Sequence, residues 1–225
     1  MPEGPEVWFL GRVLRNVLEP VGRSVVLHGK HLVLDGTVHH HFGLSGGLRM
    51  DVTTATDAAI VEITLRHHHG KGPVSGSAKP VTAAEVAALC AEGLDWMTAP
   101  RDAIADVIAA AAFRRKALGA WMLDQHAIAG VGVAWASEIA AAARLDVARP
   151  MCAQNLIKLA DAYISVREKA VALYTALLPP PFDTEAAKTA VNNWYRNLYA
   201  ARAPSLTVYS VGTPVLISGR TFWKL

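Results

Sequence analysis

The chain has 225 residues and a formal net charge of +3, with a sequence pI near 9.0, which permits nucleic-acid binding without requiring it. This length can bury a substantial core in one large or two small domains. No apolar run is long enough to cross a bilayer and the first residues do not form a signal peptide, so we expect a cytoplasmic protein. The two cysteines, Cys90 and Cys152, form no CxxC motif, which favours a reducing compartment and disfavours a cysteine-ligated zinc site.

The first part of the chain predicts one helix followed by short strands. Apolar residues recur at helical spacing over residues 5–18, which indicates an amphipathic helix. Between residues 24 and 65 the pattern changes to short β-like runs, and Asp35-Gly36 between two of them is typical of a hairpin turn. Residues 70–80 are rich in glycine, serine and proline and indicate a loop or interdomain linker. We therefore expect a small, mostly antiparallel β region before the linker.

The second part predicts helices and then a β-like tail. Thr82 and Glu85 form a capping-box pattern at the start of a helix. Helical segments are expected at residues 82–89, 102–113, 115–125, 133–144, 153–178 and 184–201. Residues 204–225 return to β-like alternation, with Gly219 as a turn residue. The order of elements indicates an α+β protein with two domains.

The N-terminal sequence Met-Pro-Glu-Gly-Pro-Glu suggests a nucleophile. If Met1 is removed, Pro2 becomes a terminal secondary amine, and such an amine titrates near neutrality, far below the ~10.4 of a lysine. It can then attack an electrophilic carbon and form an iminium, while the carboxyl group of Glu3 transfers protons. Taken alone, the motif is more typical of an ordinary chain start in a disordered loop. Further motifs are needed to support a catalytic interpretation.

Five sequence blocks extend over nearly the whole chain: MPEGPEV from Met1, GKHL from Gly29, HFGLSGGL from His41, MLDQHAIAGVG from Met122 and GTPVLISGRTFW from Gly212. In this order they resemble the formamidopyrimidine-DNA glycosylase and endonuclease VIII family of bifunctional DNA-repair glycosylases. One block alone would be weak evidence, but five in the family's order make coincidence implausible. The resemblance implies an N-terminal β-sandwich-like domain with a flanking helix, followed by a helical helix–two-turn–helix domain and a finger, with DNA in the cleft between the domains.

The predicted boundaries are an N-terminal catalytic β domain at residues 1–72, a linker at 73–80, the helix–two-turn–helix domain at 81–202 and a finger at 203–225. Most bacterial members of the family resembled build the finger around zinc held by four cysteines, the ligand set that a structural tetrahedral site requires. This tail contains no cysteine. We therefore expect a zincless β-hairpin finger, no metal and no other cofactor. Its core is predicted to contain Trp194, Tyr195, Phe222 and Trp223.

The resemblance also implies catalytic roles for four residues. Pro2 matches the nucleophile that attacks the deoxyribose C1′ of a flipped, damaged nucleotide, and Glu3 matches the general acid or base at the sugar. Lys30, expected in a strand after a glycine turn, matches a lysine that contacts the lesion phosphate, although a strand lysine by itself is more often solvated. Arg220 matches the finger arginine that clamps phosphates, a task that suits the fork of donors on a guanidinium. The implied reaction is base excision followed by β,δ-elimination.

Further residues are predicted to bind DNA. Glu6 matches the second glutamate of the family's N-terminal motif and is assigned a positional role there. Gly130 and Gly132 match the turn between two helices, where amides at the start of the next helix would point at a phosphate. The family's asparagine after the second glycine is replaced by Val133, which removes one charge-assisted hydrogen bond and weakens binding by about 1.5 to 3 kcal/mol.

Two histidine triplets, at residues 39–41 and 67–69, raise the alternative of a metal site. We expect none, because alternate strand residues face opposite sides and neither triplet has a carboxylate or cysteine to complete a site. The second triplet lies where the family carries a loop that fills the space of the flipped base, and that loop's motif is absent. His67, His68 and Lys71 are candidate replacements for its DNA contacts.

We therefore expect a monomeric, bacterial-type, nucleoid-associated enzyme that acts on damaged double-stranded DNA and not at membranes. Oxidised pyrimidines are the favoured lesions, because the chain is short between residues 18 and 30 and has no candidate for the lesion-recognition loop of oxidised-guanine enzymes. Two alternatives stay open. One is a related DNA-binding protein without catalysis, and the other retains only lyase activity at abasic sites.

Overall fold

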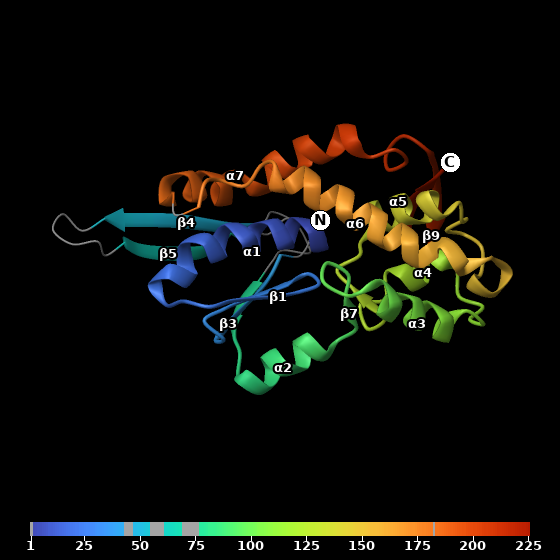
Figure 1. The fold of residues 1–225 in the computed structure, drawn as a ribbon, viewed down its shortest axis with the longest axis horizontal. Helices are drawn as coiled ribbons and strands as arrows, with labels where there is room; N and C mark the ends of the chain where they lie inside the picture. Colours follow the sequence, from blue (N-terminus) through green and yellow to red (C-terminus); the bar gives the residue numbers. More distant parts are fainter. Residues whose placement is uncertain (1, 43–46, 55–60, 69–76, 182) are drawn as a thin grey trace.

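The computed structural model describes residues 2–42, 47–54, 61–68, 77–181 and 183–225 (Figure 1). The strands of residues 25–80 and the first helix lie at one end of the molecule, and the short helices of residues 101–143 and the C-terminal hairpin lie at the other. Two long helices, α6 (Leu159–Thr175) and α7 (Thr184–Arg202), both pack against the N-terminal helix and so connect the two ends. No helix in the described parts of the chain is long and apolar enough to span a membrane.

Helix α1 (Gly4–Leu18) starts with a reciprocal cap. Glu3 precedes the helix, and its backbone N–H donates to the Glu6 carboxylate over 2.9 Å. The apolar side of α1 is buried against strand β1 (Val25–His28) and against α6 and α7. Gly11 allows the closest approach, because a Cβ atom at this position would lie 2.3 Å from Cδ1 of Leu27. The predicted amphipathic helix is therefore present and defines one wall of the N-terminal half.

A four-stranded antiparallel sheet follows, with strand order β1-β2-β3-β6. Its strands are β1 (Val25–His28), β2 (His31–Leu34), β3 (Val38–His41) and β6 (Ser77–Pro80). The predicted Asp35-Gly36 turn joins β2 to β3, and both residues have positive φ, 54° and 63°. The end of the predicted linker instead forms the outer strand β6, paired with β3 from Val38 opposite Pro80 to His41 opposite Ser77. A proline is compatible with an edge strand, where its missing N–H breaks no ladder bond.

Strands β4 (Gly47–Thr54) and β5 (Val61–His68) form a separate antiparallel ribbon that packs on α7. Asn192 of α7 fastens the edge of β4. Its side-chain amide accepts from the N–H of Met50 over 2.9 Å and donates to the carbonyl of the same residue over 3.1 Å. One side chain thereby satisfies both backbone groups of an edge residue, which water would otherwise have to bind.

The helical half contains α2 (Ala83–Ala91), α3 (Arg101–Ala111), α4 (Leu118–Met122), α5 (Val133–Ala143), α6 and α7, with a short parallel pair of β7 (Leu94–Asp95) and β8 (Ile128–Ala129). The 3-10 segments are Glu19–Val21, Met151–Ala153, Leu156–Lys158 and Ala203–Ser205. All six predicted helices are present, but two are shorter than expected. Helix α6 begins at Leu159 because 3-10 turns precede it, and α4 begins at Leu118 because the preceding backbone pairs with residues 149–152.

The tail forms a hairpin of β9 (Thr213–Ile217) and β10 (Arg220–Lys224), while residues 206–212 are not in a strand. Phe222 is fully buried against α4, where a Cβ atom on Gly119 would lie 2.9 Å from its ring. The ring of Trp223 lies 4.4 Å from that of Tyr209. Both tail aromatics therefore pack at the hairpin as predicted. Trp194 instead packs edge-on against Phe42, with ring centroids 5.3 Å apart. The side chain of Tyr195 lies outside the described part.

Candidate active site

Three glycines bring the N-terminus, the β1–β2 turn and the turn before α5 into backbone contact. The N–H of Gly4 donates to the carbonyl of Gly130 over 2.6 Å. A Cβ atom on Gly29 would lie 2.8 Å from that of Ala129 and 3.0 Å from the nitrogen of Gly130. Gly29 and Gly130 also have positive φ, 56° and 96°, where side chains are strained. Larger residues would separate the three segments, so glycines create the site by allowing close approach.

Two polar side chains hold these turns in place. The amide of Gln125 accepts from the N–H of Gly130 over 2.9 Å and donates to the carbonyls of Leu123 and Val131, both over 3.0 Å. Asp95 at the end of β7 accepts from the backbone N–H of Gly29. Neither role was recognised in the sequence, although Gln125 belongs to one of the five blocks. The turn before α5 is thus fixed by hydrogen bonds as well as by its glycines.

Glu3 is 4% exposed and points at the start of α5. Its two carboxylate oxygens accept from the backbone N–H groups of Ala134 and Trp135, each over 3.2 Å. Gly132 makes this possible, since a Cβ atom there would lie 2.2 Å from the Cδ of Glu3. A helix N-terminus favours a negative charge. The predicted partner of these amides was a phosphate, but two of the amides are occupied by Glu3. Glycine is required at position 132 because a side chain there would collide with Glu3.

The environment of Glu3 favours its protonated form. Burial raises the pKa of the carboxyl, and the nearby charge of Glu6 raises it further. Lys30, Arg202 and the α5 amide of Trp135 act in the opposite direction, but the net shift is upward. A carboxyl group with a raised pKa keeps its proton closer to neutrality and can deliver it there. Since Pro2 is its neighbour in the chain and is buried beside it, a proton donor lies next to the predicted nucleophile.

Glu6 is 3% exposed and holds the N-terminal segment in place through hydrogen bonds on its buried side. Its Oε1 accepts from Arg202 over 2.7 Å, from the hydroxyl of Tyr174 over 2.8 Å and from the indole N–H of Trp135 over 3.4 Å. Its other oxygen accepts from the backbone of Glu3. This burial supports the positional role of Glu6, and its assignment to the DNA-binding residues stays a prediction.

Arg202 and Tyr174 were not found by sequence reasoning. Arg202 is 5% exposed at the end of α7 and lies 196 positions from Glu6 in the chain. Its guanidinium also lies over the rings of Tyr199 and Tyr209, 5.6 and 5.8 Å from their centroids. Nothing in the local sequence distinguishes this arginine from the others near it. Four helices therefore meet at one buried carboxylate, directly behind the predicted nucleophile.

Lys30 lies in the two-residue turn between β1 and β2 and not in a strand as predicted. It is partly buried, and burial lowers its pKa; the charges of Glu3 and Glu6 oppose this fall, and that of Arg220 adds to it. Both Glu3 and Arg220 therefore lie near enough to Lys30 to act on its pKa. A catalytic role for these residues stays a prediction.

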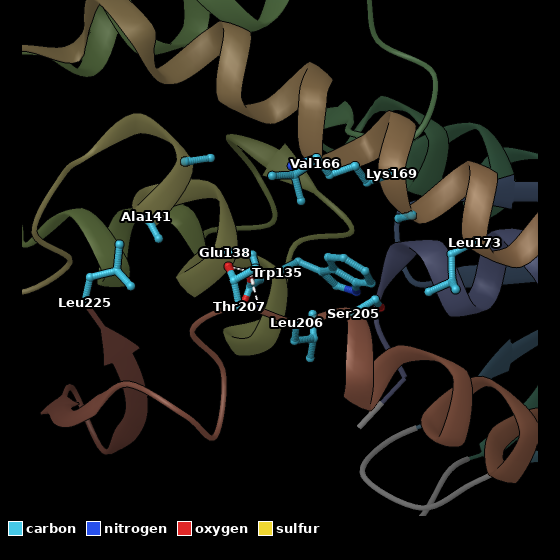
Figure 2. Close-up of a pocket in the computed structure, with 12 residues that line it drawn as sticks. Trp135, Glu138, Ala141, Val166, Lys169, Leu173, Ser205, Leu206, Thr207 and Leu225 are labelled. Atoms are coloured by element: carbon cyan, nitrogen blue, oxygen red, sulfur yellow. Dashed lines mark hydrogen bonds between the residues drawn. The ribbon is translucent and has the colours of Figure 1, made fainter.

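The hairpin that carries Arg220 is fastened to α5 by Glu138 (Figure 2). This carboxylate accepts four hydrogen bonds, from the hydroxyl and N–H of Thr207 at 2.6 and 3.0 Å, and from the N–H groups of Val208 and Tyr209 at 2.7 and 2.8 Å. Arg220 itself is exposed at the start of β10, after a tight turn in which Ser218 and Gly219 have positive φ. The arginine is thus presented to solvent by a rigidly held support.

The pocket beside Glu138 is lined by α5, α6 and the segment before the hairpin, and its volume is about 200 Å³. Trp135 forms part of its wall (Figure 2). The same residue donates its backbone N–H to Glu3 and its indole N–H to Glu6. Trp135 therefore stands between this pocket and the two N-terminal carboxylates.

The remaining predicted residues are only partly described. His67 and His68 end strand β5, opposite Leu48 and Gly47, but their side chains lie outside the described part. Lys71 lies outside it altogether. Their predicted DNA contacts stay predictions.

Histidines of the first triplet meet a neighbour on β2. Nδ1 of His31 and Nε2 of His39 are 2.9 Å apart, and burial together with His39 lowers the pKa of His31 to about 4. His41 faces the same side, with its ring 6.2 Å from that of His31. Within the described ranges, no group of three or more His, Cys, Asp and Glu side chains is arranged to hold a metal ion. The pair His31–His39 is neutral at physiological pH and shares a hydrogen bond.

Comparisons with known proteins agree with this architecture. No family model matches the chain, and no curated protein matches its sequence. Solved structures do match over nearly their whole length. The MutM (Fpg) protein of Thermus thermophilus superposes with a TM-score of 0.65 at 20% identity, over 100% of this chain and 97% of that protein.

The chain has the MutM fold. Two complexes of Lactococcus lactis Fpg (MutM) superpose equally well, each with a TM-score of 0.65 and 16% identity. One contains DNA with an oxidised pyrimidine and covers 99% of this chain and 97% of that one. The other contains DNA with N7-benzyl-Fapy-dG and covers 100% and 98%. The predicted α+β class and the MutM-like arrangement are therefore confirmed, at an identity too low to transfer an activity.

Proposed function

We propose that the chain belongs to the formamidopyrimidine-DNA glycosylase and endonuclease VIII family and acts as a bifunctional DNA glycosylase and abasic-site lyase. One observation carries this proposal. The carboxyl group of Glu3 is held by the first amides of α5, beside Pro2, with a pKa raised by burial. A buried proton donor next to a chain-terminal secondary amine is the pair of groups that imine chemistry requires.

The proposed reaction starts from the mature form, in which removal of Met1 leaves Pro2 as an amine. Its nitrogen attacks C1′ of a flipped nucleotide, and the damaged base departs with the proton that the amine loses. The protonated Glu3 then delivers its proton to the sugar ring oxygen as the ring opens. The product is an iminium between Pro2 and C1′. Loss of a C2′ proton then drives β-elimination of the 3′ phosphate, and δ-elimination of the 5′ phosphate follows. Hydrolysis of the remaining imine returns the free amine.

Lys30 and Arg220 would bind the phosphates on either side of the flipped nucleotide. Lys30 lies in the β1–β2 turn near Glu3, and Arg220 at the start of β10 is near enough to Lys30 to lower its pKa. Contacts to phosphates give affinity without reading sequence. The base has to leave the helix for C1′ to be reached, as in other enzymes that act on bases. We propose damaged double-stranded DNA as the substrate, with oxidised pyrimidines as the preferred lesions.

A second candidate function is abasic-site lyase activity without base excision, or DNA binding alone. It is favoured by Val133, the first residue of α5, which offers no side-chain donor to a phosphate. The two amides that follow it are already occupied by Glu3. Abasic sites need no base pocket, so the lyase would tolerate weaker positioning of the nucleotide.

Borohydride trapping tests the proposal. Mature protein is incubated with duplexes that carry either an oxidised pyrimidine or an abasic site, and mass spectrometry confirms the loss of Met1. We expect a covalent adduct on both duplexes. A variant with two extra residues before Pro2, whose nitrogen is then an amide, should give no adduct, and Pro2→Gly should give a reduced yield. Pro180→Gly, in the loop before α7, serves as the matched control.

Three outcomes separate the candidates. Adducts on the abasic duplex alone would favour the lyase. Binding without any adduct in the mature protein would favour the DNA-binding alternative. A full yield of adduct from the extended variant would overturn Pro2 as the nucleophile.

A further inference from the structure

Two loops at the far side of the helical half lie side by side. The loop between α3 and α4 pairs with the segment after α5: the N–H of Cys152 donates to the carbonyl of Arg114, that of Met151 to Lys116, and that of Leu118 to Arg149, over 3.0 to 3.2 Å. These bonds fix the backbone of both loops. Side chains on the two loops therefore form one surface with a defined shape.

This surface is strongly basic. We call it the basic surface and define it by six exposed cations: Arg114, Arg115, Lys116, Arg144, Arg149 and Lys158. Two acids lie among them, and each faces a lysine: Asp124 is 3.6 Å from Lys116, and Asp146 is 3.2 Å from Lys224. In the described residues the other five cations make no ion pair. The charge of these five cations is therefore not neutralised by an ion pair in the part of the chain that the structure describes.

The basic surface also has a hollow and an exposed aromatic ring. Arg144, Arg149 and Lys158 line a depression of about 440 Å³ together with the polar side chains of Gln154 and Asn155. Phe113 directly precedes Arg114 and is 78% exposed. The exposed ring offers a stacking face directly beside the positive charges of Arg114 and Arg115. Rings next to cations are the elements of single-strand recognition, in which bases stack and phosphates pair with charge.

The basic surface is separate from the candidate active site. Arg144 follows the C-terminal end of α5, whose N-terminal amides hold Glu3. Eleven helical residues span about 16 Å at the rise of an α-helix. That distance corresponds to about five base pairs of duplex. The loops next to α3 and α4 also lie at the opposite end of the molecule from the β4–β5 ribbon (Figure 1).

We propose that the basic surface is a second nucleic-acid site that binds a single-stranded DNA segment flanking the damaged duplex. Arg114, Arg115 and Arg149 pair with consecutive phosphates, and Phe113 stacks on an unpaired base. The positive charge and the exposed ring predict a single-stranded nucleic acid as the ligand. Only the choice of DNA as that nucleic acid rests on the proposed function. A protein with such a surface engages lesions next to gaps, forks or overhangs more tightly than lesions in continuous duplex.

The test measures binding and not chemistry, so its result is distinguishable from a failure of the glycosylase proposal. Two lesion-free probes share the same duplex of about ten base pairs, and one carries a single-stranded overhang long enough to cover the ~16 Å to the basic surface. The wild-type protein should bind the overhang probe at least tenfold more tightly than the blunt probe. Arg114→Ala/Arg115→Ala should remove most of this advantage and lower the salt slope on the overhang probe by about 1.4.

Phe113→Ala isolates the stacking contribution and should weaken binding to the overhang probe about fivefold or more without changing the salt slope. The matched control is Arg12→Ala/Lys169→Ala, which removes two exposed cations from α1 and α6. Thermal melting should show all variants folded, since each changed side chain is exposed. Equal affinity of the wild-type protein for both probes, or equal effects of test and control variants, would overturn the proposal. Equal losses on both probes would do so too, because the surface would then bind duplex.

Discussion

Two buried glutamates, Glu3 and Glu138, contact or belong to helix α5, and they differ in the number of hydrogen bonds that they accept. Glu3 reaches its first turn and receives two backbone hydrogen bonds of 3.2 Å. Glu138 belongs to the helix itself and receives four bonds of 2.6 to 3.0 Å from the segment before the hairpin. Hydrogen bonds to a carboxylate favour its charged form. The under-bonded glutamate therefore suits proton transfer, and the saturated one serves as a fastener.

The largest effect should come from Glu3→Gln. The amide keeps the shape of the side chain but removes the proton donor, so base excision should fall by about 10²- to 10⁴-fold. Single-turnover release of an oxidised pyrimidine measures this. The control is Glu168→Gln at an exposed position of α6. Excision by Glu3→Gln at close to the wild-type rate would contradict the proton-donor role.

Arg202→Leu should be the most destabilising change. It leaves the charge of Glu6 buried without its cation, which costs about 3 to 5 kcal/mol, and unfolding in urea measures the loss. Arg196→Leu, an exposed position on the same helix, is the control. Because Arg202 also holds down the pKa of Glu3, the pKa of this proton donor should be higher in the variant, and any folded fraction should keep its activity to higher pH on the alkaline side of the profile. A loss below about 1 kcal/mol would mean that Glu6 does not need this partner.

Glu138→Ala tests the attachment of the segment before the hairpin to α5. Its removal leaves the N–H groups of Val208 and Tyr209 without an acceptor, so we expect a loss of about 2 to 4 kcal/mol in the free energy of unfolding. DNA binding should weaken because Arg220 loses its support, while the rate at saturating DNA stays close to wild type. Glu168→Ala provides the comparison for both measurements. A fall in the saturated rate as large as that of Glu3→Gln would place Glu138 in the chemistry and end the contrast.

The smallest expected effect is the contribution of Glu3 to the pH dependence of the free energy of unfolding. The folded-state pKa of Glu3 lies above its ordinary value of 4.5, because of burial and the charge of Glu6. The folded chain therefore binds this proton more tightly than the unfolded chain, and stability contributed by Glu3 falls as pH rises from about 4.5 to the raised pKa. Above that pKa the penalty is constant. Glu3→Gln should lack this slope in urea titrations at several pH values; an identical slope in both proteins would show that another group causes it.

The candidate site residues that could be predicted from the sequence lie next to the start of a helix or strand. The N-terminal Pro2-Glu3 pair, the glycine turn before α5 and the exposed Arg220 all belong to short local motifs. The structure places the Pro2-Glu3 pair against that turn, and Arg220 lies near enough to Lys30 to lower its pKa. Helices were also predictable, because the apolar period is local. The exact contact of Glu3 with the α5 amides was not, since it joins residues 131 and 132 positions apart.

Three features could not be predicted from the sequence because they depend on contacts between residues that are distant in the chain or on strand pairing. Arg202 pairs with Glu6 across 196 positions, and no pattern near Arg202 indicates this. The composition of Ser77–Pro80 predicts a linker because its residues are poor strand formers, yet pairing with β3 makes it a strand. Lys30 was placed in a strand although the two-residue connection between β1 and β2 leaves it in the turn. In each case the partner, and not the local composition, decides the structure.

The contact of Gly4, Gly29 and Gly130 makes the site dependent on more than half of the chain. A ribosome-bound or truncated polypeptide that ends before α5 already carries the Pro2 amine and Lys30, but not the amides that hold Glu3. Such a fragment lacks the positioned acid and the hairpin with Arg220. Under the proposed function, in which the chain cuts a DNA strand, this order of segments delays assembly of the site until synthesis is nearly complete.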